Sequence, residues 1–315
     1  MEANSEIKAL APVLITTLCR YNLFRRCVES LSQCKNANNT DLFIALDYPL
    51  NESHYAGYQM ISNYLDTIAG FRNITVIRRS INYGPHKNET DAMNIVLMRY
   101  KKVIFSEDDN QFSPNFLDFI NNGLVKYKDN QSIFAVCGYN FPITISKSYK
   151  YNHYFSQEFC GWGYGIWEDK YKEYEKCCTE GYIREKLEPN LKYLRPSLIT
   201  CLILIIKNMR MTGDAIVSLK LIDEGLLCVF PKTSLVRNCG FDGTGQNNRK
   251  SIKSERLYCC QEIDKSDAFE YDEISEIATN NEIRKLLDEY FRIDLLRKIR
   301  SFMLLLYYKT TLKKS

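Results

Sequence analysis

Residues 101 to 119 read KKVIFSEDDNQFSPNFLDF and place three carboxylates directly behind a short apolar run. The run VIF, residues 103 to 105, has the β-branched and aromatic character of a buried strand. Glu107, Asp108 and Asp109 follow it in an entirely polar segment. In an open α/β sheet the carboxyl ends of the strands face the ligand crevice. We therefore expect this acidic triplet to lie at a binding site.

Three adjacent carboxylates need a compensating cation. Two carboxylates about 4 Å apart repel each other by roughly 1 kcal/mol in water and roughly 4 kcal/mol at a partly buried site. Mg²⁺ or Mn²⁺ shared with a diphosphate would fit, because these ions commonly take one or two protein carboxylates together with phosphate oxygens. The alternative is a solvated acidic turn before a helix, with Ser113 as the N-cap and Pro114 as the first helical residue. The other segments of the chain decide between these interpretations.

The composition is that of a globular chain without a nucleic-acid partner. A length of 315 residues with 45% hydrophobic residues suffices for the core of a large α/β domain, and a net charge of +4 implies no polyanion. The cysteines lack CxxC spacing and the N-terminus lacks a secretory pattern, so we expect reduced thiols in the cytoplasm. The longest apolar run, residues 198 to 206, is too short to span a membrane and predicts a buried helix or strand.

The first half of the chain alternates apolar runs with helical patterns. We expect strands at residues 12 to 17, 42 to 46, 73 to 77, 103 to 105 and 133 to 138, and helices at residues 22 to 32, 53 to 69, 89 to 100 and 116 to 127. This order specifies a mostly parallel α/β sheet flanked by helices, with the ligand at its carboxyl edge. The first strand-to-helix turn, residues 17 to 22, contains no glycine, which disfavours a dehydrogenase or a P-loop kinase.

Aromatic residues and glycines mark the second half. Residues 161 to 167, GWGYGIW, can bring backbone close to a ligand and offer flat apolar faces to sugars or bases, and a tight turn in a β-rich corner fits equally well. Asp214 is expected to be the N-cap of a helix that opens at Met211 and Thr212. The other segments are a helix at 168 to 175, an unassigned region at 180 to 208, a strand at 226 to 230, a glycine-bearing loop at 238 to 245 and a polar, mobile stretch at 246 to 265.

The tail, residues 281 to 315, forms a basic amphipathic pattern. Apolar residues recur at helical spacing between Ile283 and Met303, and lysines and arginines occupy much of the rest. Such a helix either lies on an anionic membrane surface or packs on the domain's own core. We expect a catalytic domain at residues 1–250, with a nucleotide-binding half at about 10–140 and an acceptor half at about 141–250. A polar linker and basic amphipathic helices would follow at 251–315.

Three segments, in this order, resemble a glycosyltransferase with the GT-A fold. They are the acidic triplet, the aromatic segment from Tyr154 to Trp167, and residues 231 to 245, PKTSLVRNCGFDGTG. The resemblance spans roughly residues 12 to 245 and is to the broad family 2 kind common in bacterial polysaccharide and O-antigen synthesis. The arrangement is more distantly similar to N-acetylglucosaminyltransferase I, which has a Glu-Asp-Asp strand end, a glycine-tryptophan loop and a later aspartate in the same order.

The resemblance implies a role for each matching residue. Asp109 matches the metal-binding aspartate, which would hold Mn²⁺ or Mg²⁺, and Glu107 and Asp108 would lie beside the ribose and sugar of the donor. Asp47 matches the carboxylate that receives the N–H of uracil. Five further matches would line the nucleotide and phosphates, namely Thr16, Arg20, Asn82, Tyr83 and Gly84. Three would form the wall of the sugar site, namely Gly161, Trp162 and Gly163.

Asp214 matches the catalytic base. An inverting transfer is a single displacement at the anomeric carbon, so a carboxylate that is not a metal ligand must take the proton of the acceptor hydroxyl. The sequence departs from the family in two places. Gln246-Asn247-Asn248 stand where a histidine often follows the GFDG loop, and Glu168-Asp169 stand where many relatives have an arginine pair. Glu168 and Asp169 are therefore reserve candidates for the base.

The expected function is a metal-dependent hexosyl or N-acetylhexosaminyl transfer from a UDP-sugar to a hydroxyl of a glycan or lipid-linked oligosaccharide. The protein would act in the cytoplasm or peripherally on the inner face of the cytoplasmic membrane. Two alternatives remain. One is a sugar- or nucleotide-binding protein that kept the fold and lost activity. The other is a sugar-phosphate nucleotidyltransferase, although residues 17 to 22 do not supply the glycine-rich basic loop which that class uses.

Overall fold

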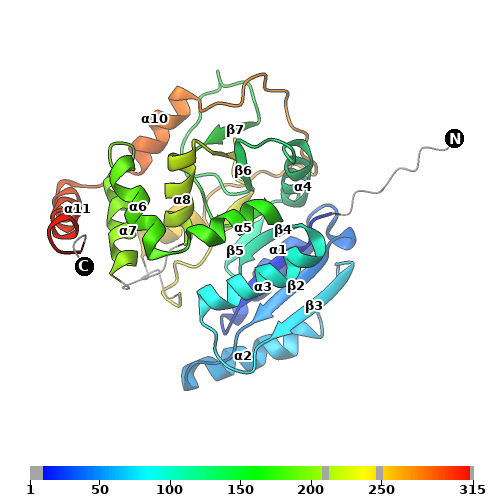
Figure 1. The fold of residues 1–315 in the computed structure, drawn as a ribbon. Helices are drawn as coiled ribbons and strands as arrows, with labels where there is room; N and C mark the ends of the chain where they lie inside the picture. Colours follow the sequence, from blue (N-terminus) through cyan, green and yellow to red (C-terminus); the bar gives the residue numbers. More distant parts are fainter. Residues whose placement is uncertain (1–9, 208–212, 246–250, 313–315) are drawn as a thin grey trace.

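One eight-stranded sheet organises the computed structural model, which describes residues 10–207, 213–245 and 251–312 (Figure 1). Its strand order is β3-β2-β1-β4-β8-β6-β9-β7. The pairs among β1 to β4 and the pair β6–β9 are parallel, whereas β8 and the edge strand β7 run antiparallel to their neighbours. The bounds of these strands are Val13–Thr17, Asp41–Leu46, Asn73–Arg78, Lys102–Glu107, Ile133–Cys137, His153–Ser156, Tyr164–Trp167 and Leu227–Pro231 for β1, β2, β3, β4, β6, β7, β8 and β9.

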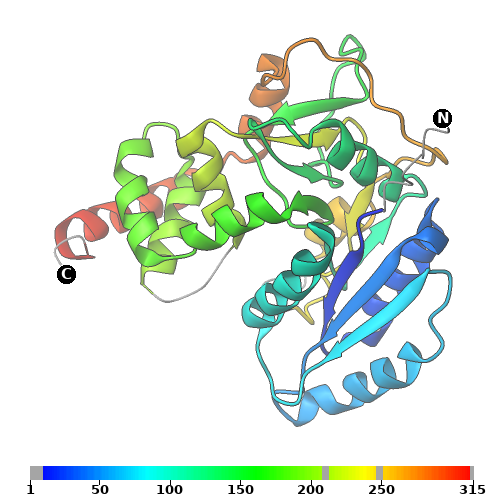
Figure 2. The same cartoon turned by 45° about the vertical axis from the view of Figure 1, so that its right-hand side comes forward.

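The first half of the chain confirms the alternation of strands and helices that its sequence predicts. Each central strand is a local apolar run, and β2 and β6 are buried along their whole length. The connecting helices cover both faces of the sheet, as Figure 2 shows for α2 and α3 beside the parallel strands. Their bounds are Tyr21–Ser32, Glu52–Leu65, Pro85–Tyr100 and Phe116–Lys126 for α1, α2, α3 and α4. The mainly parallel α/β sheet is therefore confirmed.

Strand β4 is longer than its apolar core predicts. It continues through Ser106 and ends at Glu107, so only Asp108 and Asp109 form the turn that follows. After this turn a short strand β5, Asn110–Phe112, pairs antiparallel with β10, Val236–Asn238. This second, two-stranded sheet brings the late glycine-bearing loop next to the acidic turn.

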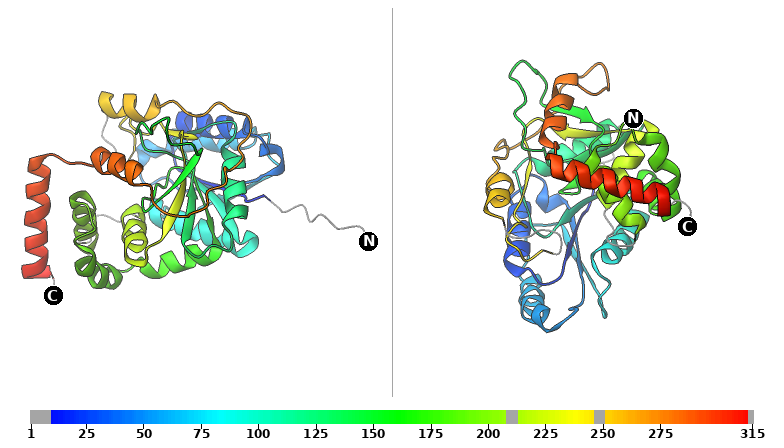
Figure 3. Two further views of the ribbon diagram at one scale, coloured as in Figure 1. Left: turned by 90° about the horizontal axis from the view of Figure 1, so that it is seen from above. Right: turned by 90° about the vertical axis from the view of Figure 1, so that its left-hand side faces the viewer.

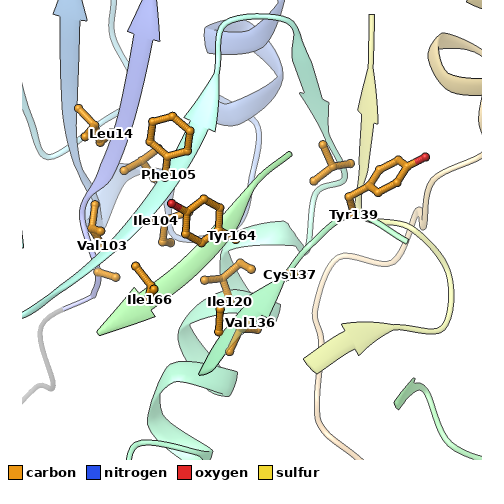
Figure 4. Packing of buried hydrophobic residues seen from close by; sticks show 14 of the residues in the cluster. Leu14, Val103, Ile104, Phe105, Ile120, Val136, Cys137, Tyr139, Tyr164 and Ile166 are labelled. Atoms are coloured by element: carbon orange, nitrogen blue, oxygen red, sulfur yellow. The ribbon is translucent and has the colours of Figure 1, made fainter. Parts of the chain in front are cut away.

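The core lies where β8 crosses between β4 and β6 (Figure 4). Phe105 and Tyr164 approach each other with ring centroids 5.6 Å apart, and Ile166 packs beside Val103. A Cβ atom built on Gly165 would lie 2.4 Å from Cγ2 of Ile120 on α4. One glycine of the GWGYGIW segment is thus required for close packing of helix on sheet rather than for ligand contact.

A layer of helices stands beside the sheet and holds a second apolar cluster. It consists of α5, Glu168–Cys177, α6, Glu180–Asn190, α7, Pro196–Ile206, and α8, Gly213–Glu224. The apolar run from residue 198 to 206 is a buried helix within α7, as expected from its length. Asp214 lies inside the first turn of α8, so the prediction that it is the N-cap was wrong. Met211 and Thr212 lie outside the described residues.

The C-terminal segment returns over the body of the protein. Gln261 donates to the Asn140 carbonyl, Asp264 accepts from Asn115, and Tyr271 donates to the Phe119 carbonyl. Within the stretch predicted to be mobile, Gln261 and Asp264 are thus bonded to the body of the protein, and Gln246 to Lys250 lie outside the described residues. This stretch contains two short helical pieces, α9, Ile252–Ser254, and η2, Glu255–Cys259.

The amphipathic tail forms two helices, α10, Asn281–Tyr290, and α11, Leu295–Tyr307, which runs on into η3, Tyr308–Leu312. Helix α11 stands at the outer edge of the helical layer (Figure 3). It packs on α7, and Ser301 donates to the Pro196 carbonyl. Within the described residues, none of the helices combines the length and apolar character that a membrane crossing requires.

Candidate active site

Arg20 is the cation that faces the acidic triplet. Its guanidinium bonds Asp108, and its Nη1 lies 2.8 Å from Oδ2 of Asp109. The second oxygen of Asp108 accepts from the Thr17 hydroxyl at 2.8 Å. Burial alone would lower the pKa of Arg20, but the charges of Asp108 and Asp109 raise it above its usual value. The sequence predicted Arg20 at the phosphates, and the structure adds that it neutralises the strand end.

The late glycine loop completes the surroundings of Asp109. Asn238, the last residue of β10, donates from Nδ2 to Oδ1 of Asp109 at 2.6 Å. Gly240 lies so close that a Cβ atom there would be 2.1 Å from Oδ2 of Asp109. The third segment of the resemblance therefore contacts the first, although they are about 130 residues apart in the chain.

Glu107 is the member of the triplet that opens to solvent. Its pKa is raised well above the usual value, first by burial among surrounding protein and then by the charges of Asp109 and Asp214. Glu89 on α3 joins this group, because burial and the charge of Asp214 raise its pKa to about 8. The sequence analysis missed Glu89, since a single glutamate in a helical pattern carries no signal.

Asp214 lies next to the glycine-tryptophan loop. A backbone hydrogen bond from Gly161 reaches its carboxylate, and a Cβ atom on Gly161 would be 3.1 Å from Oδ1. Burial by the surrounding protein raises the pKa of Asp214 to about 6 although the side chain is accessible to solvent, and the bond from Gly161 opposes that rise. A carboxylate with this pKa is a base near neutral pH.

Asp47 lies at the same edge as the triplet but organises its own loop. Its oxygens accept from the backbone N–H groups of Tyr48, Tyr83 and Gly84 at 2.8 to 2.9 Å and from Asn82 at 3.3 Å. These four donors match the acceptor positions of a carboxylate. These contacts hold residues 82 to 84 against the end of β2, and the role of Asp47 at uracil stays a prediction.

Two cavities meet the predicted site residues. The smaller, about 220 Å³, opens beside the triplet. Its lining includes the predicted metal ligand Asp109 and the predicted nucleotide-sugar residues Thr16, Arg20, Asp47, Asn82, Gly84, Glu107 and Asp108. The larger, about 940 Å³, is lined by Trp162 and Asp214. The structure thus brings the residues of the smaller cavity together, and it places Trp162 of the predicted sugar wall and the predicted base Asp214 at the larger cavity. Gly161 lines neither cavity, although it lies against Asp214. The charge of Asp214 acts on Glu107 in the smaller cavity.

Trp162 joins the two glycine loops through its ring. The indole packs edge-on against Tyr139, Phe241 and Tyr258, with centroids 4.7, 5.9 and 5.5 Å away. Gly163 turns the chain behind it with φ +77°, and its carbonyl accepts from the Gly138 N–H. Gly163 therefore shapes the loop through its backbone and packs on Phe116 and Val236 rather than lining either cavity.

A divalent ion fits the donor chemistry of this site. Asp109 and Glu107 supply hard carboxylate oxygens, and each carboxylate oxygen can accept more than one bond, so Asp109 keeps capacity beside Arg20 and Asn238. In the described ranges, no group of three or more His, Cys, Asp or Glu side chains could hold a metal ion. This arrangement suits an ion that takes its other ligands from phosphate and water.

Comparisons with known proteins give weak structural matches. No family model matches the chain, and the search of curated proteins gives no match either. The mannosyltransferase PcManGT from Pyrobaculum calidifontis, in complex with GDP-Man and Mn²⁺, is similar at 12% identity over 50% of this chain and 44% of that one, with a TM-score of 0.36. TarS 1-349 from S. aureus is similar at 12% identity over 53% of this chain and 49% of that one, with a TM-score of 0.35. A second structure of S. aureus TarS is similar at 14% identity over 42% of this chain and 25% of that one, with a TM-score of 0.30.

This chain thus covers less than half of each of these proteins. Such similarity does not identify a function, which has to be inferred from the residues of this chain.

Proposed function

We propose that this protein is an inverting, metal-dependent glycosyltransferase with a GT-A type fold, which uses UDP-sugar as its donor. The observation that carries the proposal is a cavity that contains the acidic strand end and Arg20, together with a second cavity that contains Asp214, whose charge acts on Glu107 of the first. A transferase needs two adjoining sites of this kind, one for the donor and one for the acceptor.

In this proposal Asp214 is the base. The bond between the anomeric carbon and the diphosphate oxygen breaks while a bond from the acceptor hydroxyl oxygen forms on the opposite face, and the hydroxyl proton moves to the Asp214 carboxylate. Gly161 orients that carboxylate through its backbone bond. Glu168 is a weaker candidate, because its oxygens are held by Lys101 at 2.9 Å and by Lys172 at 2.7 Å.

The donor diphosphate would lie between Arg20, the triplet and the N-terminus of α3 at Gly84 and Pro85. Asp109 and Glu107 would hold Mn²⁺ or Mg²⁺, which supplies positive charge for the leaving diphosphate. Asp108, with both oxygens bonded to Arg20 and Thr17, would set the position of the guanidinium. The N-terminus of a helix carries a partial positive charge and free backbone N–H groups, which favour phosphate as well.

The proposal includes a lipid-linked acceptor and peripheral contact with an anionic membrane through α11. Seven large apolar residues of this helix are 41% to 79% exposed, namely Leu295, Leu296, Ile299, Phe302, Met303, Leu306 and Tyr307. At 100° per residue they form one stripe opposite the face that packs on α7, and Lys298 and Arg300 flank it on either side. Basic amphipathic helices of this form bind anionic lipid surfaces.

A screen of nucleotide sugars with MnCl₂ tests this function. We expect metal-dependent release of the nucleoside diphosphate from one or a few UDP-sugars, and its suppression by EDTA. UDP binding by calorimetry without turnover of any donor or acceptor would favour a binding protein that lost activity. Formation of nucleotide sugar from a nucleoside triphosphate and a sugar phosphate would instead indicate the nucleotidyltransferase.

A further inference from the structure

The larger cavity lies between the sheet and three helices, of which α10 is distant in the sequence from α7 and α8. Its wall includes the N-terminal part of α7, one side of α8 and the side of α10 that carries Ile283 and Leu287. Its volume of about 940 Å³ is at the upper end of the range that pockets for drug-sized ligands occupy. The space therefore suits a ligand larger than a single sugar ring.

Arg195 fixes the shape of this cavity instead of offering a free cation. Its guanidinium lies 2.5 Å from Glu158 and 3.1 Å from Asp288, and it stacks over the ring of Phe291 at 4.4 Å. These contacts connect the start of α7 to the loop after β7 and to α10. Because both carboxylates hold it, Arg195 is already neutralised.

The rest of the wall is acidic and aromatic. Its described residues include five carboxylates and two arginines but no lysine, and the carboxylates are Glu158, Asp214, Asp223, Glu224 and Asp288. Sites for phosphate or carboxylate groups instead gather arginine and lysine donors. Four of these carboxylates are paired, Glu158 and Asp288 with Arg195, Asp223 with Lys186 and Glu224 with Lys220. An anionic ligand is disfavoured because the described residues of this wall include no cluster of arginines and lysines.

Aromatic side chains supply the flat apolar surfaces. They are Tyr139, Phe141, Phe155, Phe159, Trp162, Tyr193, Tyr290 and Phe291. The buried hydroxyl of Tyr139 has no hydrogen-bond partner among the described residues, and such a group costs about 1 to 3 kcal/mol until a partner satisfies it. Figure 4 shows this hydroxyl pointing away from the apolar core. This hydroxyl is itself buried, so the surfaces that a ligand can reach here are the aromatic faces.

We infer that this cavity binds the acceptor and that the acceptor is an uncharged glycan of more than one ring, without phosphate, sulfate or carboxylate on the bound portion. The inference rests on the proposed function, because Asp214 at one end of the cavity is the base that the acceptor hydroxyl must reach. The aromatic rings hold the faces of the sugar rings, and the described wall lacks the cluster of basic side chains that an anionic polymer would need.

A glycan array tests this inference with fluorescently labelled full-length protein in UDP and MnCl₂. We expect signal on neutral oligosaccharides and none on their phosphorylated, sulfated or sialylated counterparts. The variant Ser218→Trp fills the cavity from α8 and should lower the array signal at least tenfold, whereas Ser218→Ala, which removes only the hydroxyl, should retain it. Tyr193→Ala, at a side chain that is 61% exposed, should weaken binding as well.

Calorimetric titration of UDP separates the two proposals, because UDP belongs to the smaller cavity. Unchanged UDP affinity in Ser218→Trp, together with the lost array signal, supports the inference. Binding only to anionic glycans, binding that Ser218→Trp leaves intact, or no glycan signal from a protein that binds UDP would overturn it. Failure of the unmodified protein to bind UDP or any other nucleotide would remove the proposed function itself.

Discussion

Nη1 of Arg20 lies 2.8 Å from Oδ2 of Asp109, so the positive charge that compensates the acidic strand end belongs to the chain itself. Arg20→Ala leaves Asp108 and Asp109 buried without that charge, and removing one partner of a buried ion pair costs about 3 kcal/mol. We expect urea unfolding to report a loss of this size, and 5 to 10 mM MnCl₂, a concentration on the order of a weak metal Kd, to restore part of it.

The matched control for that variant is Arg25→Ala. Arg25 pairs with Glu29 on the exposed face of the same helix, so its removal should change stability little. If Arg20→Ala unfolds at the same urea concentration as the unmodified protein, Arg20 does not neutralise the triplet.

The close approach of Gly240 to Asp109 predicts that turnover depends on the absence of a side chain at position 240. Gly240→Ala would put a methyl group 2.1 Å from Oδ2 of Asp109 and displace the carboxylate proposed to hold the metal. A displacement on the order of 1 Å at a reacting site can cost about 10²-fold in turnover. Steady-state kinetics of donor turnover should show that loss. Gly181→Ala in α6 meets no atom within 4 Å and should leave turnover unchanged, so an equal effect of both changes would contradict the steric explanation.

These contacts separate what the sequence could predict from what it could not. The parallel half of the sheet was predictable, because each of its strands is a local apolar run and each connecting helix has its own periodic pattern. The bonds from Arg20 and Asn238 to Asp109 were not, because they join residues about 90 and 130 positions apart and depend on how the second sheet folds over the first.

Contacts between distant segments also explain what the sequence left unpredicted elsewhere. Residues 180 to 208 gave no assignment apart from the buried apolar run at 198 to 206, since α6 and α7 pack mainly on one another, on α8 and on α11, and α7 is apolar around most of its circumference. Asp47 was placed at the correct edge from the end of β2. Its four backbone and side-chain donors, however, come from a turn whose geometry the sequence does not encode as a pattern.

Asp214 predicts the pH dependence of the reaction. With a pKa of about 6, the carboxylate is protonated in more acidic solution, so kcat should rise about tenfold per pH unit up to pH 6 and then level off. Asp214→Asn should reduce kcat by about 10² to 10⁴-fold and remove this acid limb, while UDP affinity stays the same. A folded Asp214→Asn variant with undiminished turnover would exclude Asp214 as the base.

Glu89 predicts a pH dependence of stability. Its pKa rises to about 8 on folding, so the folded state holds the proton more tightly than the unfolded state does. Without divalent ions, this group therefore makes the protein less stable as the pH rises from about 4.5 to 8. Glu89→Gln should gain stability over the unmodified protein across that range, measured by urea unfolding at several pH values. The exposed Glu262→Gln serves as the control, and a parallel pH profile for both variants would refute the assignment.

Helix α11 predicts binding to anionic lipid. Its apolar stripe supplies insertion and Lys298 with Arg300 supplies attraction, worth about 1 kcal/mol per basic residue near a charged surface. The double variant Lys298→Gln with Arg300→Gln should therefore lower partitioning onto phosphatidylserine vesicles about 30-fold in a sedimentation assay. Phe302→Ser should weaken it too, by removing buried apolar area. Lys147→Gln with Lys150→Gln makes the same change in net charge on the β6–β7 connection and should bind normally. Equal loss in both double variants, or equal binding to neutral phosphatidylcholine vesicles, would show that α11 is not the anionic-lipid contact.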